Sequence, residues 1–241
     1  MLSNPSLNTL AGGTIIRITN SQFGTNSYLI SEPEKNGTGA LCTVIDPGLD
    51  RINLEFAFEL CGWIPSAILC THGHFDHVGG ASWIQNKYSI PVYISEDDYK
   101  LTKLSNFMMA AFKIKDRINL PEFTFLNFTS PSEDNVLIKT GGNKFLFNKL
   151  PGHTPGSCII RVGMNLFSGD SFYSKHIGLS KLPGENHKQL RNSLIDLFKL
   201  INDDLLVLPG HGSESTLGNI RNFNFELSNF LKSESFNASK K

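Results

Sequence analysis

The chain has 241 residues, in which 22 Lys and Arg balance 22 Asp and Glu, 40% of the residues are hydrophobic and 18% are charged. This composition can build a large core and excludes a disordered protein, while the length fits one layered domain. A zero net charge attracts no phosphate backbone, and no apolar run approaches the roughly 20 residues that span a bilayer. We therefore expect one domain over residues 1–241, with a polar tail from about residue 233, that binds neither nucleic acid nor membrane.

The N-terminus and the cysteines indicate a cellular compartment. The first 13 residues, MLSNPSLNTLAGG, carry neither the basic nor the apolar region of a secretory signal. The four cysteines, at positions 42, 61, 70 and 158, form no Cys-x-x-Cys pair, which is typical of a reducing environment. We expect a cytoplasmic protein whose cysteines are small buried residues.

Apolar periodicity predicts strands and helices along most of the chain. Short apolar runs bounded by turn residues at 14–19, 27–31 and 41–45 predict a hairpin-linked sheet. Helical spacing over 52–63 predicts a helix, and the continuous apolar run 66–71 predicts a covered strand. The other predicted elements are helices at 79–88, 187–201 and 219–232, a helix-rich stretch at 96–115, and strands at 91–94, 144–148, 158–162, 165–168 and 205–208. This order predicts an α/β fold of two sheets with helices on their outer faces.

The segment 118–135 has a different character. It carries Phe123, Phe125 and Phe128 with two prolines and little periodicity. It fits either a loop over a pocket or a core-crossing element with a weak pattern, and we slightly favour the loop. Its aromatic side chains fit two roles, a pocket lid or the contact face of a homodimer, and the sequence leaves both open.

A histidine cluster follows the predicted strand 66–71. The sequence THGHFDHVGG places His72, His74, Asp76 and His77 within six residues, beside glycines that let the backbone fold around an ion. Imidazole and carboxylate groups are ligands for zinc, iron or manganese. A lone His-x-His pair is weak evidence, because surface histidines are common, whereas this full pattern indicates metal binding.

Three further candidates each stand at the end of a predicted strand, beside a turn glycine: His153 in LPGHTPGS, Asp170 in LFSGDSFY and His211 in VLPGHGSES. Each alone fits a simple turn residue. Together with the cluster at 72–77 they supply five histidines and two aspartates. That set suffices for two metal ions with three separate ligands each and one shared carboxylate.

The order of these motifs resembles the metallo-β-lactamase-fold hydrolase superfamily, in particular its glyoxalase II-like (hydroxyacylglutathione hydrolase) branch. The likeness runs from Ser27 to about Arg221 and includes NSYLI at 26–30, IDPG at 45–48, GHTPG at 152–156 and LPG at 182–184. It implies a single-domain α/β fold, a four-layer αββα sandwich, with the metals in a groove at the sheet edges. It also implies two divalent ions per chain, zinc foremost, with iron or manganese as alternatives.

The resemblance implies a role for each candidate. The two ions take three separate ligands each: His72, His74 and His153 for the first, and Asp76, His77 and His211 for the second. Asp170 bridges the two ions. Asp46, in the family's Asp-Pro-Gly turn, orients a ligating histidine rather than touching a metal, and a plain turn aspartate is the alternative for this residue.

A dinuclear site of this kind favours thioester hydrolysis. Two dications lower the pKa of a bridging water from about 15.7 towards 7, which supplies a hydroxide nucleophile, while one ion polarises the substrate carbonyl. Asp76 serves both as a ligand and as an acceptor of the hydroxide's proton. A thiolate leaves without a general acid, since the pKa of a thiol is about 8.5. Together with this chemistry, the resemblance to the glyoxalase II-like branch implies a small hydroxyacyl thioester such as S-lactoylglutathione as the substrate.

Tyr173, three residues after Asp170, is a candidate proton donor for a more basic leaving group. Lactonases of this superfamily resemble the chain in carrying a tyrosine there. Since the family usually has Phe at this place, packing is the favoured interpretation of Tyr173, and lactone hydrolysis is an alternative function.

Two other functions stay open. A persulfide dioxygenase of the same fold uses one iron, held at the positions of His72, His153 and Asp170. A non-catalytic metal-binding module is disfavoured, because degenerate members lose ligands and the set here is complete. The lack of a signal segment argues against a β-lactamase, and the lack of basic excess argues against a nuclease.

Overall fold

Two β-sheets form the centre of the structure, a computed structural model that describes residues 6–10, 13–32, 39–128 and 135–233. The first sheet has the order β1-β2-β3-β4-β5-β6-β7, with strands Ser6–Leu10, Gly13–Thr19, Asn26–Ser31, Leu41–Ile45, Ile64–Leu69, Val92–Ser95 and Phe123–Leu126. The second has the order β13-β12-β11-β10-β9-β8, with β8 Asn135–Thr140, β9 Asn143–Lys149, β10 Cys158–Val162, β11 Asn165–Gly169, β12 Leu206–Pro209 and β13 Ser215–Thr216. Residues 129–134 and the predicted tail after Ser233 lie outside the described residues.

Alternation of apolar side chains gives each sheet two buried faces. In β2, Ile15 belongs to the core between the sheets, whereas the next residue, Ile16, belongs to the core under the outer helices. From the second sheet, Phe145 and Phe147 of β9 are fully buried in the same inter-sheet core. Each such side chain contributes about 1.5–3 kcal/mol when buried, so face-to-face packing of the sheets fixes their relative position.

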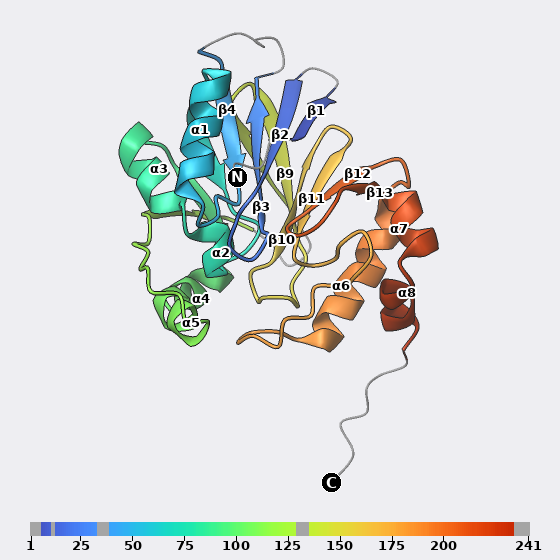
Figure 1. The fold of residues 1–241 in the computed structure, drawn as a ribbon. Coiled ribbons are helices and arrows are strands. Elements are labelled where there is room, and N and C mark those ends of the chain that lie inside the picture. The colour runs from blue at the N-terminus through green and yellow to red at the C-terminus, as the bar shows by residue number, and fades with distance from the viewer. Residues whose placement is uncertain (1–5, 11–12, 33–38, 129–134, 234–241) are drawn as a thin grey trace.

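Helices cover the outer face of each sheet (Figure 1). They are α1 (Arg51–Cys61) and α3 (Ala81–Tyr88) on the first sheet, and α6 (His187–Leu200), α7 (Leu217–Phe223) and α8 (Phe225–Lys232) on the second. Leu54 and Phe58 carry the contact of α1, and Leu190 and Leu194 that of α6. The layers run α, β, β, α, which confirms the predicted single-domain sandwich.

Short helices lie beside the first sheet near the end of β5. They are α2 (Phe75–Val78), the 3-10 turn η1 (Glu96–Asp98), α4 (Tyr99–Thr102) and α5 (Ser105–Ala111). Phe75, Leu101, Met108 and Met109 form a separate small core between them. This core anchors the chain segment that carries the histidine cluster.

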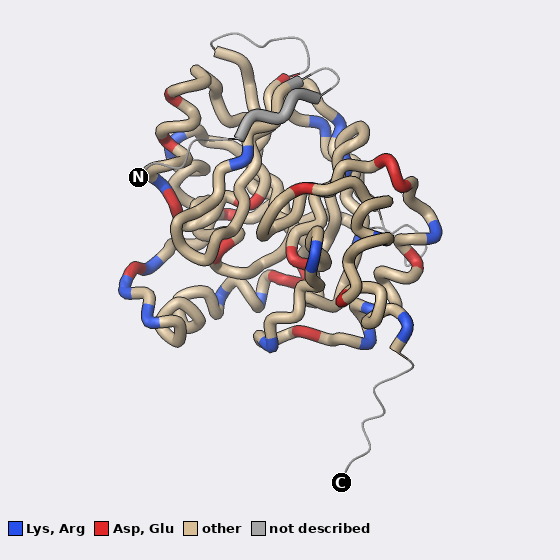
Figure 2. Tube along the Cα trace, turned by 45° about the vertical axis from the view of Figure 1, so that its right-hand side comes forward, with Lys and Arg blue, Asp and Glu red and all other residues tan. Residues whose placement is uncertain are grey.

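The burial of the cysteines and the distribution of charged residues agree largely with the sequence-based expectations. Cys42, Cys70 and Cys158 are buried, as predicted, whereas Cys61 is half-buried. Basic and acidic segments are interspersed along the trace in the view of Figure 2. None of the helices within the described ranges has the length and apolar character needed to cross a bilayer.

The loop interpretation of 118–135 is wrong over its centre. Residues 123–126 form β7, which pairs in parallel with β6 at the edge of the first sheet. Phe123 and Phe125 pack against the core under the outer helices, and Phe128 packs against the inter-sheet core. The strand is only four residues long and has a partner on one side, so its sequence pattern is weak.

The predicted helix 219–232 is two helices, because the chain turns at Asn224 (φ −86°, ψ 87°). Its Oδ1 accepts a hydrogen bond from the backbone N–H of Leu227 at 2.9 Å and so caps α8. Its Nδ2 donates to the carbonyl oxygens of Tyr173 and His176, both at 3.0 Å. The apolar spacing continues across this cap, which is why periodicity alone predicted one helix.

Replacing Asn224 with Ala removes the cap of α8 and two partly buried hydrogen bonds. We expect Asn224→Ala to lower the free energy of unfolding by about 1–3 kcal/mol. Asn222→Ala is the matched control, since Asn222 is exposed on α7, and should change that free energy by less than about 0.5 kcal/mol. Urea denaturation followed by circular dichroism measures both variants, and equal values would contradict the capping role.

Candidate metal centre

The seven candidate ligands lie where strands of both sheets end. His72 and His74 follow β5, Asp76 and His77 lie in α2, His153 lies between β9 and β10, Asp170 follows β11, and His211 follows β12. The strands β4, β5 and β6 are parallel, as are β11 and β12, so their carboxyl ends meet at common edges. The structure brings all seven side chains together in one site.

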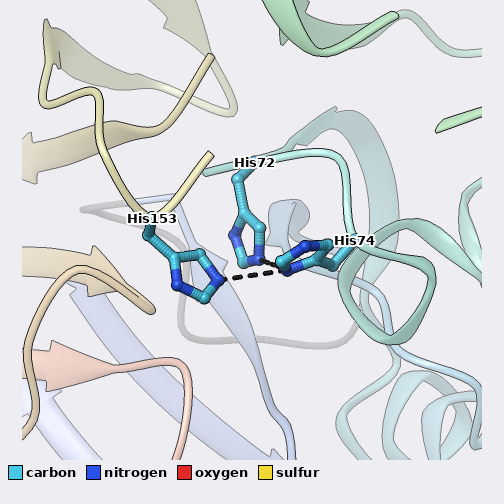
Figure 3. A group of neighbouring side chains, drawn as sticks. All are labelled: His72, His74 and His153. Atoms are coloured by element: carbon cyan, nitrogen blue, oxygen red, sulfur yellow. Dashed lines mark hydrogen bonds between the residues drawn. The ribbon is translucent and has the colours of Figure 1, made fainter. Parts of the chain in front are cut away.

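His72, His74 and His153 form the first cluster (Figure 3). Nδ1 of His74 lies 3.0 Å from Nε2 of His72 and 3.0 Å from Nε2 of His153. All three rings are buried. Three ring nitrogens from two separate loops therefore converge on one small space.

The outer nitrogens of two of these rings are already engaged. His153 Nδ1 lies 2.8 Å from the carbonyl oxygen of Gly178, which only accepts, so this nitrogen carries the proton of the neutral ring. The Thr71 hydroxyl donates to Asp46 at 2.6 Å and therefore accepts from Nδ1 of His72 at 3.1 Å. With Nδ1 engaged in this way, the tautomer of each ring that binds a metal is the one whose Nε2 lone pair points into the shared space.

Asp76, His77 and His211 form the second cluster. Oδ2 of Asp76 lies 3.7 Å from Nε2 of His77 and 3.6 Å from Nε2 of His211. Asp170 lies against both histidines, with Oδ1 3.3 Å from His77 Nε2 and Oδ2 3.3 Å from His211 Nε2. Its Oδ2 also lies 3.8 Å from His153 Nε2, so Asp170 stands between the two clusters.

The two clusters differ in their electrostatics. Burial and the neighbouring His153 lower the pKa of His74 to about 3, which leaves this ring neutral at pH 7. Burial also opposes protonation of His211, but the charge of Asp170 outweighs it and raises the pKa of His211 to about 9. Burial opposes ionisation of Asp76, yet the histidines beside it lower its pKa to about 2. The second cluster therefore keeps its carboxylates ionised and attracts positive charge.

Two buried atoms at the centre test whether a cation fits. His77 Nε2 and Asp170 Oδ1 are 3.3 Å apart, and neither has a hydrogen-bond partner. Burial opposes protonation of His77, but the carboxylates of Asp170 and Asp76 raise its pKa well above the usual value, so the ring carries a proton on both nitrogens and balances their charge. Asp46 Oδ2 lies 3.0 Å from His77 Nδ1 and keeps that nitrogen protonated, so a dication that displaces the proton of Nε2 would satisfy both Nε2 and the Asp170 carboxylate. The donor set therefore fits a metal ion.

Asp46 supports the site from behind. Its carboxylate accepts hydrogen bonds from the backbone N–H of Thr71 at 2.7 Å and from the Thr71 hydroxyl, and it faces Nδ1 of His77. Although Asp46 also lies near His72, these donors already occupy its oxygens. This position agrees with the orienting role inferred from the motif and not with a plain turn aspartate.

Two residues make hydrogen bonds to or beside other ligands that the sequence did not predict. The Thr25 hydroxyl donates to Oδ2 of Asp76 at 2.8 Å. Asn26 Nδ2 donates to the carbonyl oxygens of Pro209 and Gly212, on either side of His211, at 3.0 and 2.8 Å. The NSYLI motif marks Asn26, but nothing in the sequence connects it to a loop 183 residues away.

Two glycines allow the backbone to approach Asp170 closely. A Cβ atom at Gly210 would lie 2.1 Å from Asp170 Oδ1, and one at Gly178 would lie 1.4 Å from the Asp170 carbonyl oxygen. No side chain fits at either distance. Gly210, the turn residue before His211, is therefore required by the packing of the site and not by the turn alone.

Tyr173 lies beside the second cluster. Its ring meets that of His211 edge to face, with 5.8 Å between centroids. Burial and the neighbouring Asp170 carboxylate raise the pKa of its hydroxyl well above the usual value, so the hydroxyl keeps its proton. Tyr173 and His211 line a cavity of about 470 Å³ together with Ser174, Lys175, His176, Gly212 and Ser213. A cavity of this volume accommodates a small molecule.

Known proteins resemble this chain in sequence. The model of the metallo-beta-lactamase superfamily matches residues 21–211. The hydroxyacylglutathione hydrolase GloC of Haemophilus influenzae is 30% identical over 199 residues, which cover 81% of this chain and 89% of that protein.

Solved structures share the fold. The BLEG-1 B3 metallo-beta-lactamase superposes with a TM-score of 0.75 at 26% identity, covering 89% of this chain and 99% of that one. TTHA1623, solved in a di-iron-bound form, superposes with a TM-score of 0.71 at 30% identity, covering 86% and 97%. Members of this superfamily are mostly metal-dependent hydrolases. On its fold, its paired ligand clusters and its family match, the chain belongs to the metallo-beta-lactamase superfamily.

Proposed function

We propose that the chain is a dinuclear metal-dependent hydrolase of a hydroxyacyl thioester such as S-lactoylglutathione. The observation that carries the proposal is the place of Asp170, whose Oδ2 lies 3.3 Å from His211 Nε2 in one cluster and 3.8 Å from His153 Nε2 in the other. A carboxylate between two histidine clusters suits a site for two ions. The similarity to GloC, which is named a hydroxyacylglutathione hydrolase, supports the thioester class.

The proposed ligands are those of the two clusters. The first ion would take His72, His74 and His153, the second would take Asp76, His77 and His211, and Asp170 would serve both. Zinc suits a set of imidazoles and carboxylates. Iron has support from the di-iron form of TTHA1623, and manganese accepts the same ligands.

The chain's own residues orient the reaction and accept a proton. When bound, two divalent ions would lower the pKa of water towards neutrality and polarise a carbonyl group. Asp76 would accept a proton from the attacking water, and the Thr25 hydroxyl fixes the carboxylate that does so. The Gly178 carbonyl holds the His153 ring in the tautomer whose Nε2 faces the site.

The leaving group favours a thioester over a lactone. A thiolate needs no proton donor at neutral pH, since the pKa of a thiol is about 8.5. An alkoxide is far more basic and benefits from a donor. The protonated Tyr173 hydroxyl is a candidate for that role only if the substrate is a lactone.

Metal content and thiol release test the proposal together. We expect two ions per chain by elemental analysis of anaerobically purified protein. We also expect thiol release from S-lactoylglutathione that chelation abolishes and zinc restores. A single iron with oxygen uptake on glutathione persulfide would instead indicate a dioxygenase. A chain that binds no ion would overturn the proposal.

Replacing Asp170 with Ala should abolish activity and lower the bound metal below two ions per chain, because both clusters lose a ligand. Asp196→Ala is the matched control, since Asp196 is an exposed aspartate of α6 that pairs with Lys199. Both variants are measured by elemental analysis and thiol release. Two ions and full turnover in the Asp170 variant would rule out the bridging role.

Replacing Tyr173 with Phe keeps the ring against His211 and removes only the hydroxyl. We expect kcat for thioester hydrolysis to stay within about threefold, whereas loss of a required general acid lowers a rate by about 10²–10⁴-fold. The same preparations are assayed on S-lactoylglutathione and on a lactone. A hundredfold loss on the thioester would refute the packing interpretation, and a loss confined to the lactone would favour a lactonase.

A further inference from the structure

Asp98 is a buried aspartate that the proposed chemistry does not use. It is the last residue of η1, directly after β6, and β6 neighbours the strand that leads to the histidine cluster. Its exposed fraction is 0%, whereas the side chain of Asp97, one residue earlier, is 51% exposed. An acidic residue this deeply buried needs a reason, since burying a carboxylate is costly unless hydrogen bonds compensate it.

The Asp98 carboxylate accepts three hydrogen bonds from two separate loops. Oδ2 accepts from the backbone N–H of Gly73 and from the Thr154 hydroxyl, both at 2.7 Å. Oδ1 accepts from the backbone N–H of Gly156 at 2.7 Å. Three donors of this kind stabilise the carboxylate as an acceptor and fix the position of all three groups.

The two loops are those that carry the first histidine cluster. Gly73 lies between His72 and His74, and Thr154 directly follows His153. These loops belong to different sheets, one after β5 and the other between β9 and β10. A single carboxylate therefore spans the gap between the sheets at the point where the three rings meet.

Close packing reinforces these hydrogen bonds. A Cβ atom at Gly156 would lie 2.6 Å from Cγ of Asp98, and one at Gly73 would lie 3.0 Å from Cβ of Asp98. Both backbones thus rest directly on the Asp98 side chain. A longer or differently shaped residue at position 98 would push the loops apart.

We propose that Asp98 is a positioning residue that sets the separation of the His72–His74 loop and the His153 loop, and thereby the affinity of the first cluster for its metal ion. The inference rests on the proposed function for the identity of the ligand, but its geometric part does not. Asp98 makes no contact with the second cluster among its three hydrogen bonds, so its effect should be confined to one ion.

The test compares Asp98→Asn with Asp97→Asn in the full chain. Asparagine has nearly the same shape as aspartate, but one acceptor oxygen becomes an NH₂ group. Because an NH₂ group does not accept hydrogen bonds, at least one of the donors that face Asp98 loses its partner. Zinc and cobalt affinities are measured by chelator competition, and the cobalt absorption bands report the coordination of each site. We expect Asp98→Asn to lower the affinity for one of the two ions by about 10–100-fold and to leave the affinity for the other ion unchanged. Asp97→Asn should leave both affinities unchanged.

Thr154→Val is a second, milder variant that tests the inference if Asp98→Asn does not fold. It removes one of the three donors and leaves the carboxylate in place, so the same ion should bind more weakly by a smaller factor. Thermal unfolding of each metal-free variant checks that the fold is retained. Wild-type affinity for both ions in the Asp98 and Thr154 variants would overturn the inference.

A metal-free measurement separates this inference from the proposed function. Amide hydrogen exchange at Gly73 and Gly156 reports their hydrogen bonds to Asp98 without any ion. We expect exchange at both amides to accelerate at least tenfold in Asp98→Asn and not in Asp97→Asn. If the wild-type chain binds no ion, the proposed function fails, while unchanged exchange in the Asp98 variant shows that Asp98 does not hold the loops.

Discussion

The site depends on one electrostatic constraint, which is that the carboxylates of Asp76 and Asp170 are largely buried and require positive charge beside them. His77 Nε2 lies 3.3 Å from Asp170 Oδ1, and the carboxylates raise the pKa of His77 and that of His211, so these rings supply the positive charge when no ion is bound. Charged groups stay buried in this way only if the surrounding backbone and side chains hold them in place. Asp46 behind His77, Thr25 beside Asp76 and the Gly178 carbonyl behind a third ligand supply that restraint through hydrogen bonds. The arrangement thus stores an attraction for cations in the fold itself.

The elements that the sequence predicted well are those with strong apolar patterns. The predicted strands 41–45 and 158–162 agree with the structure at both ends, because each is covered on both faces. The edge strand β7 has one partner and half-buried side chains, so its pattern resembles that of a loop. Asn224 breaks a helix without a break in apolar spacing, and its cap on α8 together with its long-range hydrogen bonds explains the turn.

The candidate ligands could be identified from the sequence because histidine or aspartate beside glycine at a strand end is a local pattern. Their supports could not be identified in this way. Thr25 reaches Asp76 across 51 residues, and Asn26 reaches Pro209 across 183. No local rule connects such positions, which meet only after the sheets have packed. Asp98 is similar, since its acidic run looks like an exposed helix start until the two loops close over it.

Each cluster draws its ligands from both sheets. In the first cluster, His72 and His74 follow a strand of the first sheet, and His153 follows a strand of the second. In the second cluster, Asp76 lies after a strand of the first sheet, and His211 follows a strand of the second. An ion bound in either cluster would therefore link the N-terminal half of the chain to the C-terminal half across the sandwich. A ligand that binds only the folded state stabilises it by a free energy that grows with the logarithm of its concentration divided by its Kd. Bound ions would thus hold the two sheets together, and removal of metal would lower the free energy of unfolding of the whole sandwich.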